Sequence, residues 1–323
     1  MPKDNSKTES SEKLLPDIVK MPRPEKEYMN ISKVAHYISG NTGLLDNETS
    51  LRLKTIPKKN IFVAVDLHKD EHLQLSSPNV TQYDMAVLDA VYTLFVNRQS
   101  IFSPEMLLRI MSGNFDQNAS PQKVGSITRS INKLRHIDIR IDYTDEARAR
   151  KLIGKNRTAV ITSYLLPVDE IESRAANGQT IHAYRLLTEP ALYVYARNIK
   201  QIIDVPTVLL ETHDTLSDTD EVIVIKRYLV KRIEGMKNSK NRLLSTKITY
   251  EWYDVKTKTT KGMFAELGYQ KENFSEVGWR TKKSKLHKSV SQLLTAFQKD
   301  GYIKSFAEVR GAKSSIEGMN IVL

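Results

Sequence analysis

Three consecutive segments between residues 81 and 135 each begin with a residue that caps helices, and this punctuation limits the fold more than any other feature. Thr81 precedes Asp84 as in a capping box. Ser103 and Ser120 are each followed by a proline, which is favoured in the first helical turn. Behind each cap, apolar residues recur three and four positions apart, which predicts one buried face per helix. These apolar residues are Val87, Leu88, Val91, Leu94 and Phe95, then Met106, Leu107, Ile110 and Met111, then Val124, Ile127, Ile131 and Leu134.

A strand pattern follows the third helix. Residues 138–143 alternate between apolar and polar side chains, and residues 158–166 supply a return strand. The connection between them is basic, and it contains Arg148, Arg150, Lys151, Lys155 and Arg157. With Ile101-Phe102 as a short strand, the order is helix, strand, helix, helix and hairpin. This order is typical of a winged-helix domain, with the basic connection as its wing tip.

The C-terminal third repeats this order. Residues 217–220 begin a helix with buried positions at Val222, Ile225, Leu229 and Ile233, and residues 246–253 are a strand or a short helix. A weak helix at 262–267 and a loop at 273–279 lead to a basic helix at 281–298. Residues 302–306 and 319–323 then form a hairpin with a turn at 310–313. The apolar face of the basic helix consists of Leu286, Val290, Leu293, Leu294 and Phe297.

We therefore expect an α+β protein with two tandem winged-helix domains and a disordered N-terminal tail. The tail is residues 1–27, the first domain is 28–212 with extensions, and the second, basic domain is 213–323. Within the first extension, 28–39 is expected to be a short helix, and 61–65 and 73–75 a pair of strands. Residues 191–196 are either a strand or a helix that begins at Pro190.

The positive charge of the chain is concentrated in its last third. The net charge is +11, but residues 226–323 hold 21 Lys/Arg and 9 Asp/Glu, a net +12, whereas the other 225 residues hold 28 basic and 29 acidic groups. Such a segment attracts polyanions and releases their counterions on binding. We favour nucleic acid over anionic lipid because no amphipathic anchor sets Trp or Phe against a lysine face.

Several classes of protein do not fit the composition. No run approaches the roughly 18–20 apolar residues that cross a bilayer, and the N-terminus lacks the apolar stretch of a signal peptide. The absence of cysteine removes disulfides, thiolate nucleophiles and Cys-ligated metals. We expect a cytoplasmic protein that binds no membrane and no cofactor.

Catalytic motifs are missing as well. The sequence has no Gly-x-x-x-x-Gly-Lys-Ser/Thr phosphate loop. His68 and His72 are four residues apart, but their flanks resemble strands and no third ligand is near, so we expect no metal site. The acidic pairs at 169–170 and 218–220 are explained more simply by a linker and a helix cap. We therefore expect binding without catalysis.

Two helices carry the candidate DNA contacts. A helix fits the major groove, where Arg, Lys, Asn and Gln reach base edges while lysines and hydroxyls fix phosphates. In the helix 121–135, we expect Arg129 and Asn132 to specify the sequence, with positioning by Lys123, Ser126, Thr128, Lys133 and Arg135. The helix 281–298 is expected to grip phosphates, with Ser289 and Gln292 as base readers. Its other contacts are Lys282, Lys285 and Lys288, and the wing tips add Arg150, Lys151, Arg310 and Lys313.

Two tandem winged helices, the first opening Tyr83-Asp84-Met85-Ala86-Val87-Leu88-Asp89-Ala90-Val91 and the second ending in a basic helix and hairpin, resemble the replication initiators of iteron-carrying plasmids. The likeness covers roughly residues 60–323. It implies a protein that binds directly repeated origin sites in double-stranded DNA and opens the origin with host replication proteins. It also implies a homodimer, held by the first domain, that represses its own promoter.

Two other functions remain open at this point. One is a transcriptional regulator or partition protein of a mobile element, which would bind DNA without initiating replication. The other, which we expect less, is a DNA-processing enzyme whose site assembles from distant residues.

Overall fold

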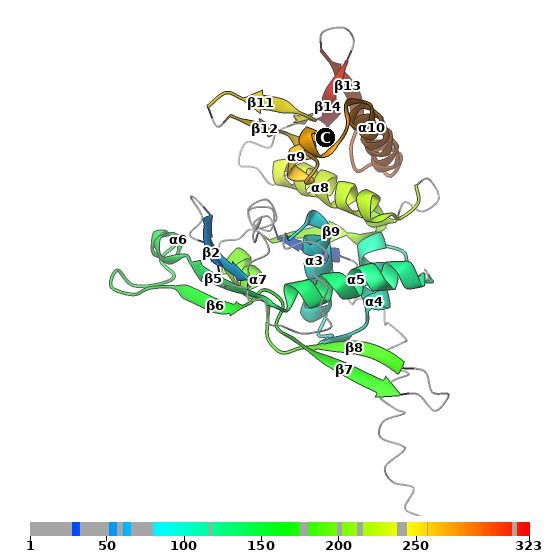
Figure 1. Cartoon of the computed structure of the whole chain (residues 1–323). Helices are drawn as coiled ribbons and strands as arrows, with labels where there is room; N and C mark the ends of the chain where they lie inside the picture. Colours follow the sequence, from blue (N-terminus) through cyan, green and yellow to red (C-terminus); the bar gives the residue numbers. More distant parts are fainter. Residues whose placement is uncertain are drawn as a thin grey trace, which may run out of the picture.

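The structure is a computed structural model that describes residues 28–32, 52–56, 61–65 and 80–323, apart from gaps at 116–117, 175–179, 199–201, 212–215, 238–243, 257 and 312–314. These residues form helices and small antiparallel sheets, which confirms the α+β class (Figure 1). The expected tail at 1–27, the strand at 73–75 and the two histidines His68 and His72 lie outside this range. No helix of the described part combines the length and the apolarity that a membrane crossing needs.

The capped helices predicted between residues 81 and 135 are present. They are α3 (Gln82–Val96), α4 (Pro104–Ser112) and α5 (Pro121–Leu134). At the start of α3, Thr81 Oγ1 accepts a hydrogen bond from the Asp84 amide at 3.2 Å, and Asp84 Oδ2 accepts one from the Thr81 amide at 2.6 Å. Ser120 Oγ caps α5 by accepting from the Lys123 amide at 3.4 Å. Local sequence therefore sets where these helices begin.

The hairpin expected to be the first wing belongs to a different sheet. Strand β5 pairs with β6 as predicted, but it also pairs with β3, which pairs with β2. The short strand β4 pairs instead with β8, and β8 pairs with β7. The prediction of 138–166 as the wing is therefore wrong. Strand β4 has only two residues, and nothing in their sequence indicates which later strand they pair with. The strands are β2 (Arg52–Ile56), β3 (Ile61–Val65), β4 (Ile101–Phe102), β5 (Ile137–Asp142), β6 (Val160–Tyr164), β7 (Val168–Arg174) and β8 (Thr180–Leu186).

A second correction concerns the N-terminal extension. The segment expected to be a helix at 28–39 contains strand β1 (Tyr28–Ser32), which pairs antiparallel with β9 (Ile202–Pro206). A helix this short is marginal by itself, and the distant strand supplies backbone partners in register. The alternative left open at Pro190 is decided for a helix, since α7 spans Ala191–Asn198.

The second unit contains the expected helices and hairpin together with an additional small sheet. Helix α8 contacts α10 and β10, and β14 lies between β10 and β13 in a three-stranded sheet. The predicted loop at 273–279 is wrong in part, because Ser275 caps α10 and the helix begins at Glu276. The elements are α8 (Asp220–Lys237), β10 (Ser245–Thr249), β11 (Trp252–Asp254), β12 (Thr259–Lys261), α9 (Met263–Glu266), α10 (Glu276–Lys299), β13 (Ser305–Arg310) and β14 (Ile316–Val322), with 3-10 turns η1 (Thr207–Leu210) and η2 (Lys271–Asn273).

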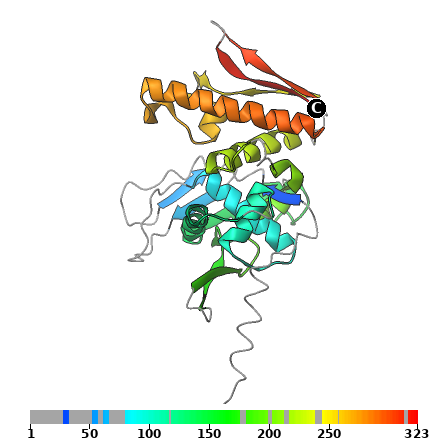
Figure 2. The same ribbon diagram turned by 90° about the vertical axis from the view of Figure 1, so that its right-hand side faces the viewer.

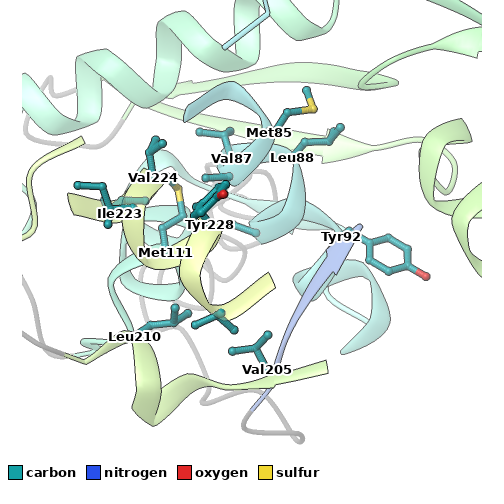
Figure 3. Close-up of a cluster of buried hydrophobic side chains, with 14 of the residues drawn as sticks. Met85, Val87, Leu88, Tyr92, Met111, Val205, Leu210, Ile223, Val224 and Tyr228 are labelled. Carbon is teal, nitrogen blue, oxygen red and sulfur yellow. The ribbon is translucent and has the colours of Figure 1, made fainter. Parts of the chain in front are cut away.

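Helix α8 lies between the two units. In Figures 1 and 2 it runs between the layer of α3, α4 and α5 and the layer of α10. Apolar side chains of α3 and α8 share one buried cluster, in which Val87 lies near Val224 and Tyr228 (Figure 3). The division into domains 28–212 and 213–323 stays a prediction, since α8 packs on both sides.

A buried ion pair joins α3 to α8. Asp89 is fully buried and accepts from Arg227 Nε at 2.5 Å and from the hydroxyl of Tyr193. Arg227 also donates through Nη1 to Gln82 Oε1 at 2.9 Å. Burial and the adjacent Asp89 raise the pKa of Tyr193 well above its usual value, so its hydroxyl stays protonated and donates. Charges buried this deeply are tolerated only when they are paired and hydrogen-bonded.

Candidate nucleic-acid interface

Helix α10 is positioned by its apolar face and by one polar chain of contacts. The buried residues of this face are Trp279, Leu286, Val290, Leu293, Leu294 and Phe297. On its flank, His287 Nδ1 lies 2.9 Å from the hydroxyl of Tyr250, and His287 Nε2 lies 3.1 Å from Glu308 Oε1. Burial, with a smaller effect of Glu308, raises the pKa of Tyr250. The phenol therefore stays protonated, and the two contacts of His287 tie α10 to Tyr250 and to β13.

The opposite face of α10 is exposed and basic. Arg280, Lys285 and Lys288 are exposed, and Thr281 and Ser284 lie among them. Residues three and four apart share one helical face, so 281 and 285 are neighbours, as are 280, 284 and 288. In the described part of the chain, no acidic side chain pairs with any of the three cations. Sequence reasoning missed Arg280 because it started the helix at 281, although the spacing 280, 284 and 288 was visible.

The other contacts predicted around α10 differ in their surroundings. Lys282 pairs with Glu221 of α8, and its ammonium lies 4.2 Å from the centroid of the Tyr269 ring. Ser289 and Gln292 are half-buried. Arg310 on β13 is exposed and donates to Glu308 at 2.5 Å. Lys313 lies outside the described residues. Lys282 is therefore used to hold α10 against α8.

The cations of α5 are engaged within the protein. Lys133 Nζ lies 2.6 Å from Asp84 Oδ2, and Ser130 donates to the other oxygen of the same carboxylate. Asp84 is buried, so this pair fixes α5 to the start of α3. At the end of α5, Arg135 Nη1 lies 2.8 Å from Glu170 Oε2 on β7. Both residues predicted to contact DNA thus stabilise the contacts of α5 with its neighbours.

The remaining predicted residues of α5 divide between surface and interior. Arg129 is exposed and donates to Ser126 Oγ at 3.0 Å, whereas Lys123 and Asn132 are half-buried. Thr128 lies near Tyr184. Burial raises the pKa of Tyr184 to about 12, and the Thr128 side chain opposes that rise. Arg129 is therefore the residue of α5 best placed for an external partner.

The acidic start of α8 lies against both basic helices. Burial raises the pKa of Asp220, and the nearby Tyr83, Lys123 and Arg129 oppose that rise. The next residue, Glu221, accepts from the Tyr269 hydroxyl at 3.0 Å and pairs with Lys282. One turn of α8 thus places carboxylates beside α5 and α10.

The two hairpins of the first unit present different charges. Arg150 and Lys151 are exposed at the end of α6 (Thr144–Ala149), between β5 and β6. They therefore lie in a connection between two strands of the four-stranded sheet, and not in the hairpin that pairs with β4. The β7–β8 hairpin carries exposed Asp169, Glu170 and Glu172, so its charge is unfavourable for phosphate contact.

Comparisons with known proteins find few matches. No family model matches the chain, and no curated protein does. Among solved structures, the chain is similar to a selenomethionine derivative of domains 2 and 3 of RctB, with a TM-score of 0.41 and 12% identity over 90% of this chain and 98% of that chain. A second structure of RctB domains 2–3 gives a TM-score of 0.40 and 11% identity over 90% and 96%.

Proposed function

We propose that this protein binds double-stranded DNA sequence-specifically and is the replication initiator of a plasmid or other mobile element. It would bind repeated origin sites, recruit host replication proteins and act in the cytoplasm. It would also form a homodimer. The observation that carries the proposal is the exposed face of α10, where Arg280, Lys285 and Lys288 have no acidic partner in the described part of the chain.

The order of the strands supports two winged-helix units. In the first unit the sheet order is β4-β8-β7, and in the second it is β10-β14-β13. In both, the strand after the first helix pairs with the last strand of the hairpin. Helix α10 directly precedes its hairpin, whereas β5, α6 and β6 lie between α5 and the β7–β8 hairpin. The helix in this position is the one that enters the major groove in related helix-turn-helix modes.

The chemistry of α10 suits phosphate contact more than base readout. Lysine and arginine on one helical face neutralise backbone phosphates, and Thr281 and Ser284 add hydroxyl donors. Arg129 of α5 would provide base contact, since a guanidinium donates in a bidentate manner to guanine. The half-buried Asn132, Ser289 and Gln292 are secondary candidates for readout.

A competition binding assay tests the proposal. Duplexes containing the repeats next to the gene are compared with scrambled duplexes of the same composition, in the presence of excess competitor DNA. We expect the repeats to bind at least about 10³-fold more tightly, as specific complexes do. Equal affinity for both duplexes would sink the assignment of sequence-specific binding.

A transcriptional regulator or partition protein is the second candidate, because it would use the same basic helix. Deleting the gene from a plasmid that depends on it distinguishes the two functions, since only an initiator is required for the plasmid to replicate. We further propose that the protein acts by binding alone. Nicking of supercoiled DNA in the presence of a divalent metal would contradict that part of the proposal.

A further inference from the structure

A two-stranded β-ribbon interrupts the second unit between β10 and α9. It consists of β11 and β12 with the described residues Val255, Lys256 and Lys258 between them, and we call it the arm. The arm forms its own sheet, and no third strand of the described chain joins it. Figure 1 shows it extending sideways from the unit. An isolated ribbon of two strands is marginally stable in water. Packing therefore does not explain why the chain forms the arm, and a binding role would explain it.

The base of the arm is held rigidly against the core. Gly262 has a φ of +116°, and a side chain there would meet the Tyr250 carbonyl oxygen at 2.7 Å. The same oxygen accepts from the Phe264 amide at 3.1 Å, and the two aromatic rings stack with centroids 5.0 Å apart. Tyr250 also contacts His287 of α10. The arm therefore leaves the body from a fixed point beside the basic helix.

Large aromatic and apolar side chains on the arm are exposed. Trp252 is 48% exposed, Tyr253 is 60% exposed and Val255 is 77% exposed. Trp252 pairs with Lys261 and Tyr253 with Thr260 in the strand register. Successive side chains of a strand point to opposite faces, so each face of the ribbon presents one aromatic ring. Tryptophan and tyrosine are enriched at interfaces, so these exposed rings are candidates for contact with a partner.

The charges around these rings favour a polyanion. Lys261 Nζ lies 5.6 Å from the Trp252 ring centroid and pairs with Asp254. Lys256 and Lys258 are exposed at the tip, and no acidic side chain of the described residues pairs with either. Lysine is depleted in protein–protein interfaces. Aromatic rings interleaved with lysines are the usual platform for single-stranded nucleic acid, whose unpaired bases stack on the rings.

We propose that the arm binds single-stranded DNA, with Trp252 and Tyr253 stacking on bases and Lys256 and Lys258 contacting phosphates. This site is separate from the exposed face of α10, whose partner is the duplex. The proposal rests on the proposed function in one respect only, the choice of DNA over RNA. Bases in an intact duplex are already stacked and cannot cover the rings, so the arm discriminates between the two forms of DNA.

Tryptophan fluorescence of the full chain tests this proposal directly. The chain has two tryptophans; Trp279 is only 3% exposed, so quenching by an added oligonucleotide reports on Trp252. We expect oligothymidylate to quench the emission. Trp252→Ala and Tyr253→Ala should each weaken oligothymidylate binding, measured by anisotropy, by between about 5-fold and about 150-fold. Affinity for duplex DNA should not change. Tyr164→Ala is the matched control, because Tyr164 is an exposed tyrosine on a strand of the first unit.

Three results would overturn the proposal. Unchanged oligothymidylate affinity in both arm variants would remove the arm from single-strand binding and leave a protein partner as the occupant of its exposed rings. Equal weakening of duplex and single-strand binding would make the arm part of the surface that binds duplex DNA. Stronger quenching by oligouridylate would assign the arm to RNA. The proposed function fails by a different result, the lack of specific duplex binding, so the two failures are distinguishable.

Discussion

Helices α5 and α10 occupy the same place in their units, yet their cations have different roles. In α5, Lys133 pairs with Asp84 and Arg135 with Glu170, and Lys123 and Arg129 lie near Asp220. In α10, Arg280, Lys285 and Lys288 face outward, and only Lys282 of the predicted contacts is held by a carboxylate. Two similar patterns of lysine and arginine thus have different outcomes. The cations of α5 pair with carboxylates of the protein, whereas those of α10 are available to a polyanion.

The acidic residues explain this difference. The carboxylates that engage α5 come from α3, β7 and α8, far away in the sequence. Both hairpins carry exposed carboxylates, and on β13 Glu308 pairs with the exposed Arg310. A basic helix can therefore be interpreted only together with the carboxylates that its fold brings near. We infer that the second unit supplies most of the attraction for DNA and that the first adds selectivity through Arg129.

The largest expected effect concerns the joint between the units. Asp89→Asn leaves Arg227 buried without its counter-charge, and breaking a buried ion pair costs about 3–5 kcal/mol. We expect urea denaturation to show a loss of this size in the free energy of unfolding. Asp145→Asn is the control, because Asp145 is exposed and its contact with Arg148 is 3.8 Å long. If Asp89→Asn changed stability no more than the control, α8 would not be coupled to α3 through this pair.

A second effect separates structural from DNA-binding lysines. Asp84→Asn weakens the bonds to Lys133 and Ser130, and hydrogen bonds to charged groups contribute about 1.5–3 kcal/mol each. Unfolding experiments should therefore show a loss of about 2–3 kcal/mol. Lys285→Ala should change the free energy of unfolding by less than about 0.5 kcal/mol, as exposed substitutions do. The reverse pattern would mean that α10, and not α5, is tied from within.

A third prediction concerns sequence selectivity. Arg129→Ala should lower the preference for the repeats over scrambled duplex by about 1–3 kcal/mol, since one bidentate base contact contributes this much. Asn132→Ala should act in the same direction but less, because Asn132 is half-buried. Competition binding at fixed salt measures the ratio of the two affinities. An unchanged ratio for Arg129→Ala would move base readout from α5 to another element.

The smallest effect, taken per pH unit, is a pH dependence that arises from a buried lysine of α8. Burial, and next the adjacent Arg227, lower the pKa of Lys231 to about 7, while Glu266 and Asp89 act in the opposite direction. An unfolded lysine titrates near 10.4, so between these values the unfolded chain binds more protons. The free energy of unfolding should then rise with pH from 7 toward 10, by at most about 1.4 kcal/mol per pH unit. Lys231→Met should reduce this rise, which denaturation at several pH values measures, and the buried Lys226, whose pKa burial also lowers, supplies what remains. The exposed-site variant Lys304→Met should keep the full rise.

Elements with local signals could be predicted from the sequence. The caps at Thr81, Ser103 and Ser120 begin helices as expected, and the apolar spacing of α10 places its buried face correctly. Pairings between distant strands could not be predicted, because a segment such as β1 or β4 obtains its partner from residues about 80 or more positions away. This is why the sequence predicted a sheet of β4 with the hairpin at 138–166, whereas β4 pairs with β8.

The candidate site was predictable in outline only. Lys285 and Lys288 were identified from their helical spacing, and the basic character of the last third indicated a polyanion. However, Lys226, Arg227 and Lys231 of that same segment are buried on α8, so the charge count overstates what reaches the surface. The partners of Lys133 and Arg135 could not be predicted either, because burial and pairing depend on tertiary contacts.

The salt dependence of duplex binding tests the difference between α5 and α10 most directly. The slope of log K against log salt reports the number of phosphates that the protein neutralises, at about 0.9 per phosphate. We predict that Lys285→Ala combined with Lys288→Ala lowers this slope by about 1.8. Lys123→Ala combined with Arg129→Ala should lower it by clearly less. An equal or larger decrease for the α5 pair would contradict the assignment of the electrostatic grip to α10.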